Sequence, residues 1–169
     1  VHAPLLQWLL QHPYLQRTPP KSTGREEFGR AYIQEIWERG AAAHLSPADL
    51  VATVTAFTAE TIIQSYRRFL LPHHSLSEIL LCGGGSKNQT LYRHIAAGLA
   101  PIPVTTTAAY QIDPEALEAI IFALLACETL AGRPGNVPTA TGAKQRVVLG
   151  KIVPGRSHAP PARNPFPLR

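Results

Sequence analysis

The part of the sequence best suited to chemistry is a glycine-rich turn, Gly83-Gly84-Gly85 followed by Ser86-Lys87-Asn88. It comes directly after residues 78–82, a short apolar run typical of a strand in a parallel sheet, and a helix is expected to begin at Asn88. Glycines let backbone N–H groups approach a ligand, and the positive end of a helix favours phosphate. A tight turn that needs positive backbone angles would explain the same glycines. The turn therefore predicts either a phosphate-binding loop or a structural turn.

Other familiar catalytic patterns are missing. The glycine spacing of a Walker motif is absent, so Lys87 is not interpreted as a P-loop lysine. Gly-x-Ser-x-Gly is absent too, which argues against Ser86 as a nucleophile. The seven histidines show no paired ligand spacing, and His73-His74 is interpreted as a solvated pair at a helix end. We expect no metal site.

Helices and short strands alternate around the turn. Apolar periodicity, capping residues and prolines predict helices near residues 5–11, 23–40, 46–72, 88–97 and 113–132. Strands are expected at residues 78–82, 104–106 and 147–149. The helix over 113–132 is rich in Ala, Leu and Ile and is expected to be mostly buried, as are the free thiols of Cys82 and Cys127. These elements predict one compact α/β body of residues 1–153.

The net positive charge of the chain comes from its last forty or so residues. The formal net charge is +5, yet residues 1–128 contain nine basic and 11 acidic residues. The seven basic residues after Glu128 are widely spaced and have a single aromatic residue, Phe166, among them, so binding to nucleic acid is not expected. No apolar stretch reaches the roughly 18 residues that a membrane span needs. Residues 154–169 are rich in proline and are expected to be a disordered basic tail.

The origin of the chain is also constrained. Two cysteines are too few for a disulfide scaffold, and no signal peptide opens the sequence, so a reducing cytoplasm is expected. The chain contains no Met and begins at Val1, which favours a fragment of a longer protein.

Three segments occur in the order found in a known family of kinases. They are Pro19-Pro20-Lys21-Ser22-Thr23-Gly24-Arg25-Glu26, then Gly83-Gly84-Gly85-Ser86-Lys87-Asn88, then Gly132-Arg133-Pro134-Gly135-Asn136-Val137-Pro138-Thr139-Ala140-Thr141-Gly142-Ala143. Together they resemble the anhydro-N-acetylmuramic acid kinases, and the resemblance covers residues 12–152, the second, C-terminal domain of that family. Residues 21–26 would then either line the cleft or simply cap a helix.

The resemblance implies an actin-like ATPase architecture of the ribonuclease H-like kind, in which two related α/β domains close over ATP. This chain would supply one of them, as a helix-rich single domain with a small mixed sheet. The full-length protein would use ATP, Mg²⁺ and water to open and phosphorylate 1,6-anhydro-N-acetylmuramic acid during peptidoglycan recycling.

The resemblance also implies roles for particular residues. The nucleotide would contact Gly83, Gly84, Gly85 and Asn88, and the sugar would contact Glu118. A solvated helix face is the alternative for Glu118. The base aspartate would lie upstream of Val1, so we expect no catalytic residue in this chain and no activity from it alone.

Departures and alternatives remain. Ala108, Ala109 and Gln111 stand where the family commonly shows acidic residues and a glycine, and Leu124 stands where a tryptophan is usual. An Hsp70-like module kept for nucleotide binding or chaperone-type interaction is the alternative function, because one fold hosts both uses. Exposed apolar groups of an open cleft would favour a homodimer.

Overall fold

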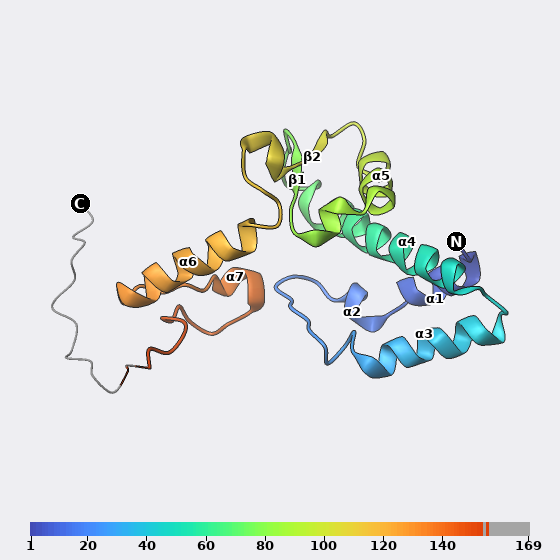
Figure 1. Cartoon of the computed structure of the whole chain (residues 1–169), viewed down its shortest axis with the longest axis horizontal. Helices are drawn as coiled ribbons and strands as arrows, with labels where there is room; N and C mark the ends of the chain where they lie inside the picture. Colours follow the sequence, from blue (N-terminus) through green and yellow to red (C-terminus); the bar gives the residue numbers. More distant parts are fainter. Residues whose placement is uncertain (154, 156–169) are drawn as a thin grey trace. The chain divides into compact units, whose positions relative to one another are not determined.

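The computed structural model describes residues 1–153 and residue 155 (Figure 1). Internal contacts divide the chain into one compact unit, Val1–Leu117, and a second unit that begins at Glu118. The tail predicted over 154–169 lies outside the described residues, apart from residue 155.

The first half of the first unit is helical. It consists of α1 (Ala3–Leu10), α2 (Pro13–Gln16), α3 (Arg30–Ala42) and α4 (Pro47–Ser65). Helix α1 packs on α4 through a core of Leu5, Leu9, Leu50 and Phe57. Helix α3 approaches α4 at Gly40, where a Cβ atom would collide with the side chain of Leu50. Small and apolar residues at helical spacing thus hold this layer together.

Helix α4 is the longest element and begins as the sequence predicted. Ser46 caps it by accepting a hydrogen bond from the Asp49 N–H, while the Asp49 carboxylate accepts one from the Ser46 N–H. Its end departs from regular α-geometry, because residues Tyr66–Leu70 form a π-helical turn. Such turns rotate the following side chains relative to the α-helical face.

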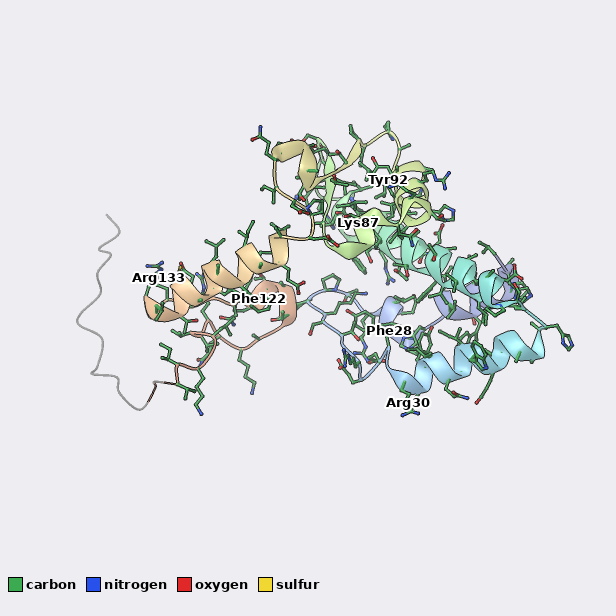
Figure 2. All side chains as sticks on the ribbon, in the orientation of Figure 1. Phe28, Arg30, Lys87, Tyr92, Phe122 and Arg133 are labelled. Carbon is green, nitrogen blue, oxygen red and sulfur yellow. The ribbon has the colours of Figure 1, made fainter. Side chains whose placement is uncertain are left out.

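A small parallel sheet forms the second half of this unit. Strands β1 (Ile79–Leu81) and β2 (Val104–Thr106) pair in parallel, with Ile79 opposite Val104, and α5 (Gln89–Gly98) connects them. The core between sheet and helices consists of Ala59, Ile63, Ile79, Ile95 and Leu99. The Tyr92 hydroxyl donates to the Val104 carbonyl at 2.7 Å and fastens α5 to β2 (Figure 2).

The second unit is built on α6 (Leu117–Leu130) and α7 (Pro138–Thr141). Asn136 shapes its irregular segment, since its Oδ1 accepts from the Val147 N–H at 2.7 Å and its Nδ2 donates to the Gln145 carbonyl at 2.9 Å. Glu128 and Arg133 pair at 2.6 Å at the end of α6. These contacts give a partial account of the Gly132–Ala143 motif: Asn136 organises a loop.

Several predictions about the elements were wrong. The sheet is parallel rather than mixed, and residues 147–149 form no strand, because Asn136 takes the Val147 N–H. Helix α3 begins at Arg30 instead of near Thr23. Residues 24–28 close a separate turn, and Gly29 then adopts an extended conformation that ends it.

Burial was also overestimated. Helix α6 has no buried residue, and its Phe122 side chain is 64% exposed (Figure 2). The cysteines Cys82 and Cys127 are both exposed free thiols rather than buried ones. Apolar composition alone therefore did not identify which surfaces this chain covers.

Candidate functional site

The glycine turn lies where β1 ends and α5 begins. Gly83 has a φ of 77°, which a residue with a side chain rarely adopts, and residues Gly84–Lys87 form a single 3-10 turn. Ser86 is buried, and its hydroxyl donates to the Gly83 carbonyl at 2.7 Å. Gly83 and Ser86 thus set the shape of the turn, so the structural reason for glycine holds at position 83.

Gly84 and Gly85 have no such structural reason. Both have φ values outside the left-handed region; a Cβ atom at Gly84 would meet nothing within 4 Å, and one at Gly85 would only touch Leu91 at 3.8 Å. No acceptor within residues 1–153 takes the N–H of either residue, whereas the Gly83 N–H donates to the Pro114 carbonyl at 2.8 Å. Two unbonded donors beside open space can bind an anion such as a phosphate oxygen.

Asn88 has a clear structural role. Its Oδ1 accepts hydrogen bonds from the N–H groups of Thr90 and Leu91, both at 3.1 Å, and so caps α5. The side-chain NH₂ group makes no hydrogen bond within the described chain. Capping accounts for the asparagine, and a nucleotide contact through its NH₂ group is compatible with that role.

Lys87 is paired across the turn. Its Nζ lies 2.6 Å from Oε2 of Glu115, and this hydrogen bond and charge raise the pKa of Lys87. Both side chains are exposed, so the pair stabilises the fold little. The lysine charge is balanced by a carboxylate rather than offered free to a ligand. Glu115 was not singled out from the sequence, and 28 positions of separation left no local signal for it.

Glu118 stands in the first turn of α6, in the second unit. Its side chain is exposed and forms no hydrogen bond or ion pair with another described residue. A solvated helix face accounts for this placement, and the sugar contact stays a prediction.

In the part of the chain that the structure describes, no three His, Cys, Asp or Glu side chains are grouped as metal ligands would be. No described helix combines the length and the apolar character required to cross a membrane.

The sequence of this chain matches a known family over nearly its whole length. The sequence model of the anhydro-N-acetylmuramic acid kinase family matches residues 1–155, and the chain belongs to that family. Among its curated relatives, the anhydro-N-acetylmuramic acid kinase of Salinibacter ruber is 42% identical over 89% of this chain. Those of a Cyanothece species and of Bacillus cereus strain ZK are 46% and 45% identical over 86% and 88% of it.

The chain matches only part of the length of each relative. It covers 38% of the Salinibacter and Cyanothece proteins and 39% of the Bacillus protein. The chain therefore corresponds to less than half of the relatives it matches.

Proposed function

We propose that this chain is the nucleotide-binding part of an ATP-dependent kinase that phosphorylates and hydrolytically opens 1,6-anhydro-N-acetylmuramic acid in cell-wall recycling. The observation that carries the proposal is the pair of unbonded N–H groups at Gly84 and Gly85, in a chain of this family. In an actin-like two-domain fold, this unit would close on ATP from one side.

The turn fits a nucleotide phosphate better than it fits a metal ion. Its donors are backbone amides and the Asn88 NH₂ group, and the lysine of the turn, Lys87, is already paired with Glu115. Magnesium prefers carboxylate and phosphate oxygens. Bound Mg-ATP would supply the phosphoryl group, with its metal held by residues outside this chain. Gly84, Gly85 and Asn88 would orient the phosphates.

Glu118 is proposed to accept a hydrogen bond from the sugar. Its carboxylate is uncommitted in the described structure, so it can accept from a hydroxyl or an amide N–H. The catalytic base would come from elsewhere in the full-length protein. Loss of a positioned base commonly costs a factor of about 10² to 10⁴ in rate, so this chain alone should show negligible kinase activity.

A direct test compares the full-length enzyme with this chain. Formation of phosphorylated N-acetylmuramic acid from the anhydro sugar and ATP should require the full-length protein. In that protein, Gly84→Val should raise KM for ATP at least about tenfold, because the branched side chain occupies the open space beside the amides. Gly155→Val is the matched control, since a Cβ there also meets nothing within 4 Å.

The possible outcomes separate the claims. If Gly84→Val kept the wild-type KM for ATP, the proposal that the turn binds the nucleotide would be wrong. Kinase activity in the 169-residue chain would contradict the proposed division of labour.

A further inference from the structure

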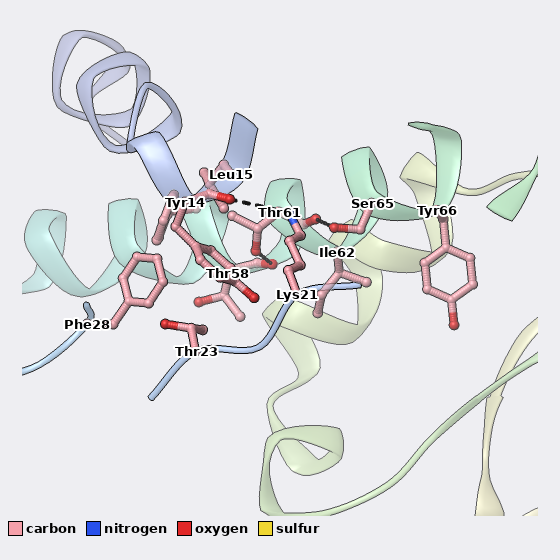
Figure 3. A pocket seen from close by; sticks show the side chains of 11 residues that line it. Tyr14, Leu15, Lys21, Thr23, Phe28, Thr58, Thr61, Ile62, Ser65 and Tyr66 are labelled. Atoms are coloured by element: carbon pink, nitrogen blue, oxygen red, sulfur yellow. Dashed lines mark hydrogen bonds between the residues drawn. The ribbon is translucent and has the colours of Figure 1, made fainter. Parts of the chain in front are cut away.

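A pocket of about 410 Å³ lies in the first unit, away from the glycine turn (Figure 3). It opens between α2, the loop that follows it, and one face of α4. Its volume is within the range of small-molecule sites. The residues that line it are Tyr14, Leu15, Lys21, Thr23, Phe28, Phe57, Thr58, Thr61, Ile62, Ser65 and Tyr66.

The walls of this pocket are mainly apolar and aromatic. Tyr14 and Phe28 meet edge to face with ring centroids 5.7 Å apart. Phe57 and Ile62 of α4 contribute further apolar surface, and the π-helical turn begins with Tyr66, which lines the same pocket. The rings of Tyr14 and Phe28 lie together at one end of the pocket, with Tyr66 at the other, and that pair of rings suits a flat apolar group of similar size.

Lys21 is the only charged residue among those lining the pocket. Its Nζ is 3.4 Å from the Tyr14 carbonyl oxygen, 4.8 Å from the centre of the Tyr14 ring and 5.1 Å from that of Phe69. Within the described chain it has no carboxylate at ion-pair distance. A partly buried ammonium group held by a long hydrogen bond and two ring faces lacks an anion.

Neighbouring positive charges add to the lack of an anion beside Lys21. The pKa of Lys21 is lowered, mainly by burial and to a smaller extent by the charges of Arg68 and Arg17. Arg17 is paired with Glu27 at 2.9 Å, whereas Arg68 donates to the carbonyls of Leu15 and Gln16 and has no carboxylate partner in the described residues. Lys21 and Arg68 therefore leave uncompensated positive charge at this end of α4.

Three hydroxyls follow one face of α4 inside the pocket. Thr58, Thr61 and Ser65 each donate to a carbonyl of their own helix, at 3.0, 2.8 and 2.8 Å. Their protons are committed, so their oxygens remain as acceptors. Figure 3 shows Lys21 reaching over α4 beside this row. A ligand that bound here could place a hydroxyl or an N–H against the row.

We propose that this pocket binds a small organic anion, with the anionic group on Lys21, an apolar ring against Tyr14 and Phe28, and a donor directed at the α4 hydroxyls. This inference does not rest on nucleotide binding, because the pocket and the glycine turn share no residue. The anionic group is a carboxylate or a phosphate monoester, and both would find the same cation.

The test uses the whole chain and measures binding by amide chemical shifts and calorimetry. The probe is 3-(4-hydroxyphenyl)propionate, with its neutral primary amide and inorganic phosphate as comparisons, and phenyl phosphate as the phosphate arm. We expect the carboxylate to shift the amide signals of Tyr14, Phe28 and Thr61 and to bind at least tenfold more tightly than the amide. Phenyl phosphate that binds more tightly would assign the anion as a phosphate ester.

Variants then locate the site. Lys21→Met keeps the length of the side chain without its charge and should weaken binding of the carboxylate at least tenfold, while Lys21→Arg should retain it. Lys151→Met, an exposed lysine of the second unit, is the matched control. The comparison of acid with amide needs only the unchanged chain, so it decides the proposal even where a variant does not fold.

Three results would overturn the proposal. They are no binding of either organic anion, equal binding of acid and amide, and inorganic phosphate alone binding as tightly as the ring-bearing anions. The last result would mean a simple anion site without a pocket for the ring.

Discussion

The backbone N–H of Gly83 donates a 2.8 Å hydrogen bond to the carbonyl oxygen of Pro114. This bond occupies a carbonyl that would otherwise lie in the first turn of a helix starting at Asp113, and α6 begins only at Leu117. The Lys87–Glu115 pair adds a second link between the same two segments. The glycine turn is therefore held on one side, while the N–H groups of Gly84 and Gly85 have no acceptor among the described residues.

Alanine at Gly83 and at Gly84 should affect folding differently. Gly83→Ala forces a side chain into a backbone conformation with φ 77° and ψ 175°, which essentially only glycine adopts, and should cost about 1–3 kcal/mol of unfolding free energy. Gly84→Ala should stay within ~0.5 kcal/mol of the unchanged chain, since its Cβ meets open space. Urea unfolding of the 169-residue chain measures both. Equal losses would mean that Gly84 also has a structural reason to be glycine.

Local signals predicted the strand–turn–helix segment well. Residues 78–82 and 104–106 contain the observed strands β1 and β2, and Asn88 caps α5 where a helix was expected to begin. Ser46-Pro47 with Asp49 likewise marked the start of α4. In each case the residues that decide the structure are neighbours in sequence, so their spacing contains the information.

Features that depend on distant partners could not be predicted. Thr23 and Glu26 have the spacing of a capping box, yet the extended Gly29 separates their turn from α3. Nothing near Lys87 indicates that it pairs with Glu115, and nothing near Lys21 indicates the pocket formed with α4. The sequence located the glycine turn, but which amides are free depends on the Pro114 carbonyl, 31 positions after Gly83.

The contact between Gly98 and Ile63 should make α5 intolerant of a larger residue. A Cβ atom on Gly98 would collide with the side chain of Ile63, which is 3% exposed and has little room to move. Gly98→Ala should therefore cost about 1–3 kcal/mol despite the better helix propensity of alanine. Denaturant unfolding gives the loss. In the Ile63→Val background the penalty of Gly98→Ala should shrink, and an unchanged penalty would show that the collision is not its cause.

The cap of α4 should give stability that depends on pH. Ser46→Ala should cost about 1 kcal/mol at neutral pH, because the Asp49 N–H loses its acceptor. Hydrogen bonds from the Ser46 side chain and backbone lower the pKa of Asp49. Because the pKa of Asp49 is lower in the folded state, its carboxylate stabilises the fold above its ordinary pKa of 3.8. This stabilisation is lost as the pH falls through the pKa that Asp49 has in the folded state.

The cost of Ser46→Ala should accordingly be smaller in acid than at neutral pH. Thermal unfolding at a series of pH values measures this, with the exposed Ser75→Ala as control. A cost that does not change with pH would show that Asp49 takes no part in the cap.

Tyr32 should be the tyrosine that ionises last. Its hydroxyl is buried without a hydrogen-bond partner in the described residues, and burial, then Glu35, raises its pKa to about 12. The pKa of Tyr110 is also raised, through its hydrogen bond to Glu78. An ultraviolet titration of phenolate formation should therefore show a last component that Tyr32→Phe removes and that Tyr110→Phe leaves in place.

The ionisation of Tyr32 should also change the stability of the fold at high pH. Because burial disfavours the phenolate of Tyr32 and puts its pKa above the ordinary value of 10.0, the fold keeps its stability up to about pH 10 and loses stability as the pH rises towards 12. Tyr32→Phe removes an unsatisfied hydroxyl and should be neutral or stabilising by up to ~1 kcal/mol. Tyr92→Phe is the matched control: it breaks a 2.7 Å bond to the Val104 carbonyl and should cost about 0.5–1.5 kcal/mol. If both variants lost the same stability in urea, the Tyr32 hydroxyl would have a partner, and its late ionisation would need another cause.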